Sequence, residues 1–179
     1  TQSRSSAASD VYKRQEVVNM AHLALGSNFC SEDPNEMQAV LDLMLEQKKC
    51  VKVYSSEGIN DRLKSGEVIM HAHWDGYSQV GKWEYMDDLT YAYPKEGVVG
   101  WFDSLVMPKG AKNVKEAKAF MNFLMNPENM AILSNNAAYA NAIPESQKYL
   151  SDKMKNATNI QVPDGCLLYT SDAADDLLC

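Results

Sequence analysis

Aromatic and acidic side chains occur together where we expect strand ends or loops. Trp74 follows an apolar run, Trp101 and Asp103 share an extended segment, and Tyr139 lies in a later loop. Because Trp101 and Asp103 are two residues apart in extended backbone, their side chains point to the same side. An indole face attracts a cation and a carboxylate accepts its N–H bonds, so the pair suits an ammonium or alkylammonium group. The alternative is that the tryptophans fill a hydrophobic core.

A second group of side chains suggests a metal site. His71, His73 and Asp75 alternate along an expected strand, which puts them on one face as possible metal ligands. The pattern resembles the opening of the metallo-β-lactamase signature, but that signature continues with a histidine where this chain has Gly76. We therefore expect no metal here, and a metal-dependent hydrolase remains the alternative from a different functional class.

Motifs and charge argue against several other functions. The sequence contains no G-x-S-x-G, no Walker motif and no dinucleotide glycine pattern. We expect no catalytic residues, no cofactor and no enzyme activity. The chain holds 24 Asp and Glu against 17 Lys and Arg, a formal net charge of −7. An acidic balance without a basic cluster argues against nucleic acid and mildly favours cationic ligands.

The two ends of the chain have an unusual relationship at the level of DNA. Residues 5–15 (SSAASDVYKRQ) and 166–176 (CLLYTSDAADD) can be written as one DNA sequence and its reverse complement. A chance match of this length is very improbable, and the DNA resembles a library-preparation adapter. We expect residues 1–15 and 166–179 to be adapter-derived tails, which are left out of fold reasoning.

Helices and strands alternate in the first half of the chain, which predicts α/β layering with a largely parallel sheet. Asp33, Pro34 and Glu36 have the spacing of a capping box that opens a helix, and Asn113 and Glu116 repeat it. The expected helices cover residues 17–25, 34–48, 59–65, 114–125 and 127–134. The expected strands and extended segments cover 50–54, 68–74, 89–94 and 97–108.

Apolar residues at helical spacing mark the faces that two of these helices should bury. In the helix 34–48 they are Met37, Val40, Leu41, Met44 and Leu45, and in the helix 114–125 they are Ala117, Phe120, Met121 and Leu124.

Residues 93–130 resemble a known family. The order Pro-Lys-Glu-Gly, Trp-x-Asp-Ser, a proline turn and a helix containing Asn-Phe-Leu resembles the periplasmic spermidine/putrescine-binding proteins of ABC transporters. The likeness extends upstream to Glu16 and downstream to Tyr139. It implies an α/β fold of the type II periplasmic-binding-protein kind, present as an incomplete two-lobed fragment. Residues 16–100 would then belong to the second lobe, 101–150 to a hinge strand and part of the first lobe, and 151–165 to a return segment.

The resemblance also implies a set of ligand-binding residues. Trp74 occupies the place of a cleft-lining tryptophan, Trp101 and Asp103 match the family's Trp-x-Asp pair, and Tyr139 matches a tyrosine in a later loop. Glu16 matches an acidic ligand residue. His73 and Asp75 flank Trp74 where the family would have an apolar residue and an asparagine, so the identity of the polyamine stays open.

The function implied by the resemblance is capture of a solute for transport. The protein would be the substrate-binding component of an ABC importer, with a polyamine or similar small cationic ligand and a membrane permease as its partners. We expect a monomer, located in the periplasm or anchored by lipid at the cell surface. The same fold with another solute, such as an amino acid derivative, ferric ion or thiamine, is the closest alternative.

Overall fold

The computed structural model describes residues 7–9, 14–28, 31–163 and 167–171. The helices are α1 (Arg14–Leu25), α2 (Pro34–Lys48), α3 (Ile59–Lys64), α4 (Asp75–Glu84), α5 (Val114–Leu124), α6 (Pro127–Ala137), the 3-10 helix η1 (Pro144–Tyr149) and α7 (Asp152–Lys155). The strands are β1 (Ala7–Ser9), β2 (Val51–Tyr54), β3 (Val98–Trp101) and β4 (Leu167–Ser171).

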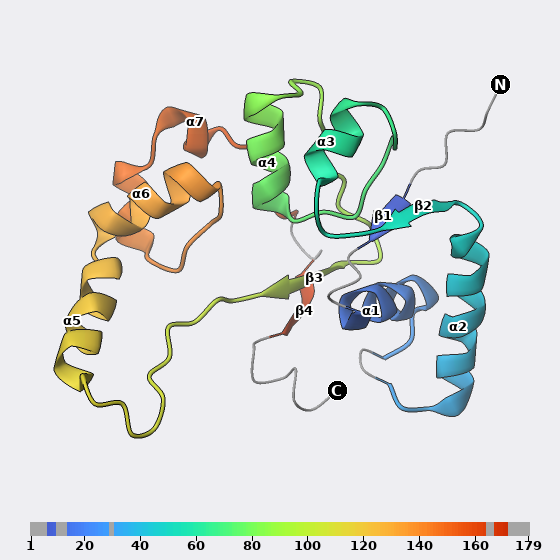
Figure 1. Cartoon of the computed structure of the whole chain (residues 1–179), viewed down its shortest axis with the longest axis horizontal. Coiled ribbons are helices and arrows are strands. Elements are labelled where there is room, and N and C mark those ends of the chain that lie inside the picture. The colour runs from blue at the N-terminus through green and yellow to red at the C-terminus, as the bar shows by residue number, and fades with distance from the viewer. Residues whose placement is uncertain (1–6, 10–13, 29–30, 164–166, 172–179) are drawn as a thin grey trace.

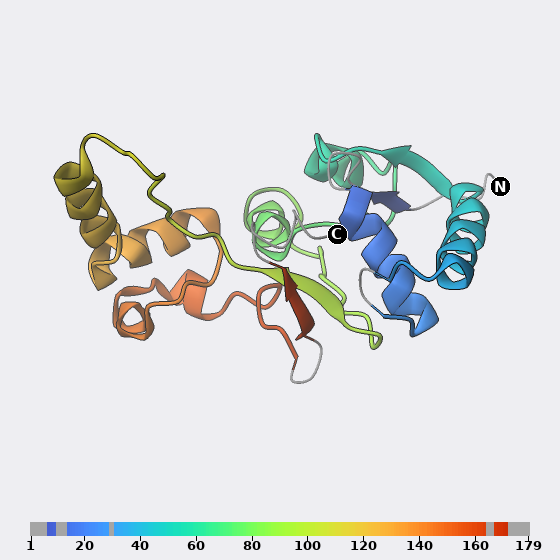
Figure 2. The same ribbon diagram turned by 90° about the horizontal axis from the view of Figure 1, so that it is seen from below.

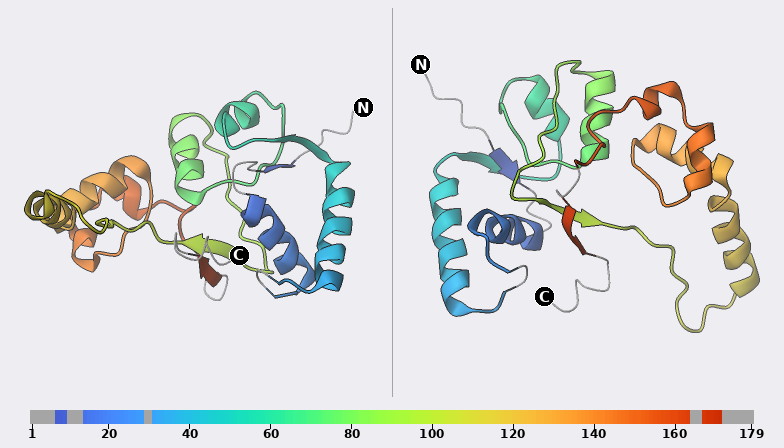
Figure 3. Two further views of the ribbon diagram at one scale, coloured as in Figure 1. Left: turned by 60° about the horizontal axis from the view of Figure 1, so that its bottom comes forward. Right: turned by 180° about the vertical axis from the view of Figure 1, so that it is seen from behind.

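The helices form two groups at opposite ends of the molecule (Figure 1). One group holds α1, α2 and α3 with the β1–β2 pair, and the other holds α5, α6, η1 and α7. Between them lie α4 and β3, and residues 102–113 and 156–163 connect this middle part to the far helices. The views in Figure 2 and Figure 3 show the same separation.

The strands form two parallel pairs. β1 pairs with β2, with Ala7 opposite Val51, and β3 pairs with β4, with Val98 opposite Leu167. Within the described residues the pairs belong to separate two-stranded sheets, and no two of the predicted strands pair with each other. β1 and β4 both lie in the tails that we expect to be adapter-derived.

Two of the predicted strands are wrong. Residues 68–74 and 89–94 have no ladder partner and run as irregular chain. The polar stretch that follows the first of them forms the helix α4, which was not predicted. An apolar run becomes a strand only where a neighbouring strand satisfies its N–H and C=O groups.

Of the two predicted helix N-caps, Asp33 and Asn113, one makes the expected side-chain hydrogen bonds. Asp33 caps α2, since its side chain accepts from the backbone N–H of Asn35 at 2.7 Å and of Glu36 at 3.3 Å. The reciprocal half of this capping box is wrong, because the Asp33 N–H donates to Ser31 Oγ instead. Asn113 is the N-cap of α5, but its side chain makes no capping hydrogen bond.

The predicted apolar stripes are partly covered: Ala117, Met121 and Leu124 of α5 are half-buried, and in α2 Met44 is half-buried. In α2 only Val40 is buried, and α5 has no buried residue. Phe120 of α5 is 58% exposed, because α5 packs mainly against α6. A core does form in the far group, where Ala131, Leu150, Met154 and Ala157 pack together with Trp83 and Ile160 against them. Within the described part of the chain, no helix is long and apolar enough to cross a membrane.

Candidate ligand-binding site

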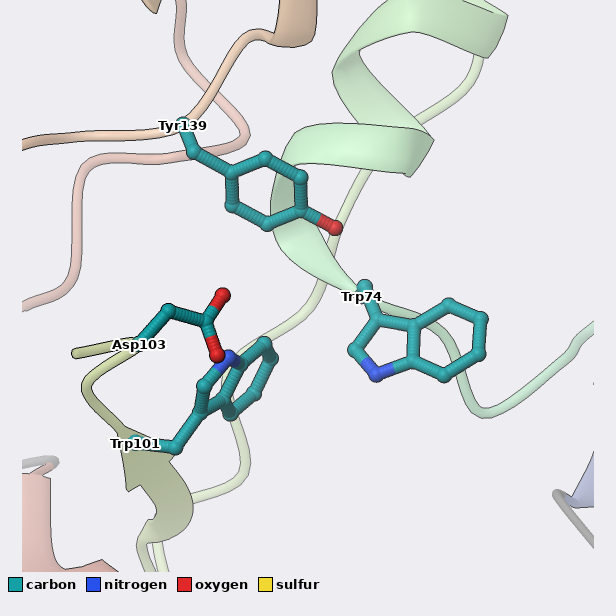
Figure 4. Close-up of a pocket in the computed structure, with 4 residues that line it drawn as sticks. All are labelled: Trp74, Trp101, Asp103 and Tyr139. Atoms are coloured by element: carbon teal, nitrogen blue, oxygen red, sulfur yellow. The ribbon is translucent and has the colours of Figure 1, made fainter. Parts of the chain in front are cut away.

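Four of the five predicted site residues line one pocket. The pocket has a volume of about 250 Å³, and Trp74, Trp101, Asp103 and Tyr139 line it. Figure 4 shows the Asp103 carboxylate directed between the rings of Trp101 and Tyr139, with the Trp74 indole across the space from it. None of these rings belongs to the buried hydrophobic core. Trp74 and Trp101 are half-buried and line the pocket.

The four side chains come from separate parts of the fold. Trp74 is the N-cap residue of α4, and Trp101 is the last residue of β3. Asp103 follows two residues later in the extended segment, and its side chain is exposed. Tyr139 comes directly after Ala138, which ends α6 in a left-handed conformation with φ of 60°. The pocket thus lies between α4, the end of β3 and the far helical group.

Hydrogen bonds from other segments hold the backbone on both sides of Trp74. The Tyr91 hydroxyl donates to the carbonyl of His73 at 2.6 Å, one residue before Trp74. Asn159 of the return segment links α4 to the segment that contains Tyr93. Its Nδ2 donates to Ser78 Oγ at 3.1 Å, and its carbonyl accepts from the Tyr93 hydroxyl at 2.8 Å. A rigid support of this kind keeps a binding side chain in place before the ligand arrives.

Two carboxyl groups, those of Asp75 and Asp103, act on the Tyr139 hydroxyl. Burial raises the pKa of Tyr139 to about 12, and the nearby Asp75 and Asp103 carboxylates act in the same direction. Burial also raises the pKa of Asp75 above its ordinary value. Tyr139 is therefore a neutral hydroxyl at neutral pH, placed near two acidic groups. Such a field favours a cationic ligand over a neutral or anionic one.

The histidines beside Trp74 are engaged in other contacts. His73 Nε2 lies 3.0 Å from Asn60 Oδ1, an acceptor, which places the ring proton on Nε2. His71 Nδ1 lies 2.6 Å from the carbonyl of Ala72. Among the described residues, no group of three or more His, Cys, Asp or Glu side chains is arranged to hold a metal ion.

Comparison with known proteins identifies the family of the chain. The family model for bacterial extracellular solute-binding proteins matches residues 6–162. The chain belongs to this family. The match begins within the segment that we expect to be adapter-derived.

Individual relatives of this solute-binding protein agree with the family match. The putrescine-binding periplasmic protein PotF of Escherichia coli is 29% identical over 152 residues, which cover 76% of this chain and 40% of PotF. The spermidine/putrescine-binding periplasmic protein of Salmonella typhimurium is 29% identical over 142 residues, with 79% and 40% coverage. The chain thus spans less than half the length of these relatives.

Solved structures show the same fold. A candidate spermidine/putrescine ABC transporter protein of Listeria monocytogenes superposes with a TM-score of 0.80 at 25% identity, covering 94% of this chain and 51% of its own. The substrate-binding protein PotD of Streptococcus pneumoniae gives 0.72 at 23% identity, covering 88% and 48%. These matches confirm the predicted type II binding-protein fold, present here in part.

Some features of the site differ from the sequence-based prediction. Glu16 lies in the first turn of α1 and is half-buried, and it is not among the described residues that line the pocket. Its assignment stays a prediction. Tyr91 and Asn159 support the site but were not predicted, because nothing in their local sequence distinguishes them from other loop residues.

Proposed function

We propose that this protein is the substrate-binding component of an ABC importer and that its pocket binds a linear polyamine such as putrescine or spermidine. The observation that carries the proposal is the position of the Asp103 carboxylate among the rings of Trp74, Trp101 and Tyr139. Polyamine-binding relatives support it further.

The chemistry of a polyamine suits each group in the pocket. The Asp103 carboxylate accepts N–H bonds from an ammonium end, and such charge-assisted bonds are roughly twice as strong as neutral ones. The indole rings attract the cation through their faces and cover the methylene chain, which removes apolar surface from water. Binding requires no bond making or breaking, so the proposed protein is a carrier and not an enzyme.

Transport also requires motion and a partner. Residues 16–100 would form part of one lobe and residues from 101 onward a hinge strand and part of the other, with Trp101 at the junction. Closure of the lobes around the ligand would create the surface that a membrane permease recognises. We propose that the protein acts as a monomer in the periplasm or from a lipid anchor, and that Glu16 is a further acidic contact.

A different solute on the same fold is the second candidate. His73 and Asp75 flank Trp74, and Asp103 is the single carboxylate among the described residues that line the pocket. A ligand with one cationic centre, such as thiamine, would need no second acid.

Calorimetric titration of the purified chain with putrescine, spermidine and thiamine tests the proposal. Saturable binding of putrescine or spermidine with a Kd of about 1 mM or tighter, and weaker binding of thiamine, is the expected result. Thiamine binding alone would favour the second candidate. A folded chain that gives no heat with any of them would contradict the proposed function.

A further inference from the structure

The ring of Tyr139 lies directly against the backbone of Gly76 in the first turn of α4. A Cβ atom added at Gly76 would lie 2.7 Å from Tyr139 Cδ1 and Cε1 and 2.8 Å from Cδ2. Carbon atoms in contact are normally about 3.5 to 4.0 Å apart. No side chain therefore fits at Gly76 unless the Tyr139 ring moves.

The backbone itself does not require glycine at this position. The φ of Gly76 is outside the left-handed region, in contrast to Gly26, Gly58 and Gly66. Glycine is among the poorest helix formers, so alanine would be preferred inside α4 if nothing else intervened. The contact with Tyr139 is the feature that excludes a side chain there.

The second glycine of α4, Gly81, has a different neighbour from Gly76. A Cβ added at Gly81 would lie 2.6 Å from Oδ1 of Asn60, a residue of α3. Gly81 thus makes room for the Asn60 side chain, whereas Gly76 makes room for a ring that lines the pocket.

We propose that Gly76 is a positioning residue for the ligand pocket: the absence of a side chain at Gly76 lets the Tyr139 ring lie against α4 and so sets the width of the pocket. Trp74 begins the same helix, and Figure 4 shows the Tyr139 ring beside the first turn of α4, above Asp103 and across from Trp74. A ring pushed outward from Gly76 moves into the space that a ligand would occupy. The inference rests on the proposed function in so far as the pocket is taken to be the ligand site.

A double-mutant cycle with putrescine as the probe tests this role. Gly76→Ala should weaken putrescine binding at least tenfold. In a Tyr139→Ala background, where no ring remains to be displaced, Gly76→Ala should change the affinity by less than twofold. Wild-type affinity in Gly76→Ala, or an equal loss in both backgrounds, would overturn the proposal.

A measurement without ligand separates this inference from the proposed function. In NMR spectra of the wild type, the ring current of Tyr139 should shift the Gly76 Hα protons, and Tyr139→Ala should abolish that shift. The Tyr139 ring resonances should move in Gly76→Ala even if putrescine does not bind to the wild type. Unchanged ring resonances would overturn the positioning role. If Gly76→Ala alone fails to fold, recovery of folding in Gly76→Ala/Tyr139→Ala would support it.

Discussion

At the residue scale, His73 is the group whose ionisation should affect the protein most. Its Nε2 bonds to Asn60, while its Nδ1 is buried and has no hydrogen-bond partner among the described residues. Burial, followed by the charge of His71, lowers the pKa of His73 to about 4 from 6.5. The folded protein therefore holds a neutral imidazole next to Trp74 at neutral pH.

This pKa predicts the direction of a pH effect on stability. Between about pH 6.5 and pH 4 the unfolded chain binds a proton at this histidine and the folded chain does not, so stability falls as pH falls. Over the whole range the contribution of His73 is roughly 3 to 4 kcal/mol, at about 1.4 kcal/mol for each pH unit between 6.5 and about 4. Urea unfolding at pH 7, 5.5 and 4.5 measures it.

The variant His73→Gln isolates this contribution from its neighbours. The pKa of His71 is also lowered, chiefly by burial, and acts in the same direction. The pKa of Asp75 is raised by burial, and its contribution is lost as pH rises through its folded-state pKa. His71 and Asp75 are unchanged in the variant. The fall in the free energy of unfolding from pH 7 to pH 4.5 should therefore be smaller in His73→Gln than in the wild type. Equal slopes in the two proteins would rule out a buried neutral His73.

At the scale of elements, the helix caps make unequal contributions. Asp33 accepts two backbone N–H bonds at the start of α2, whereas Asn113 accepts none at the start of α5. A side-chain cap satisfies donors that the first helical turn leaves free. The two residues share a sequence pattern but differ in what they do.

Alanine substitution at each cap should reveal this difference. Asp33→Ala should lower the free energy of unfolding by about 1 kcal/mol, the usual value of an N-cap bond. Asn113→Ala is the matched control and should change it by less than about 0.5 kcal/mol. Chemical denaturation of both variants measures the effect, and equal losses would show that the Asp33 bonds add nothing.

The sequence predicts the elements with local signals and misses those decided by distant contacts. Pro34 after Asp33 correctly opens α2, and the Asn126–Pro127 step correctly separates α5 from α6. Residues 68–74 have the composition of a strand, but they form no ladder with any strand in the described part of the chain. α4 contains two glycines, which weaken a helical prediction. Each glycine makes room for a side chain from another element, Tyr139 or Asn60, and this contact is seen only in the structure.

The site likewise depends partly on local sequence patterns and partly on contacts between distant residues. The residue pattern alone predicts Trp101 and Asp103 as a cation-binding pair with Trp74 and Tyr139 as further aromatic candidates, and the family resemblance adds Glu16. Their convergence in one pocket depends on how α4, β3 and the far helices pack, which no local pattern encodes.

At the scale of the whole molecule, α4 connects the pocket to the far helical group. Trp83 of α4 packs on the core around Met154, and Lys153 lies 4.4 Å from the centre of the Trp83 ring. Tyr139 enters the pocket from that far group. The helical core and the pocket therefore depend on the same packing.

Loss of this core should destabilise the protein. Met154 is 4% exposed, so Met154→Ala leaves a cavity and should cost about 2 to 4 kcal/mol. Met125, at the end of α5, is 54% exposed, and Met125→Ala serves as a control with a change within about 0.5 kcal/mol. Thermal unfolding compares the two, and similar melting temperatures would contradict the assigned core.

The most direct test of the ligand site is a calorimetric titration of putrescine into the wild type and Asp103→Asn. The substitution keeps the size of the side chain and removes its charge, so it tests the carboxylate and not the shape of the pocket. We predict that Asp103→Asn weakens binding at least tenfold, or by about 1.4 kcal/mol. Equal affinities in the two folded proteins would contradict the assignment of this pocket to a polyamine.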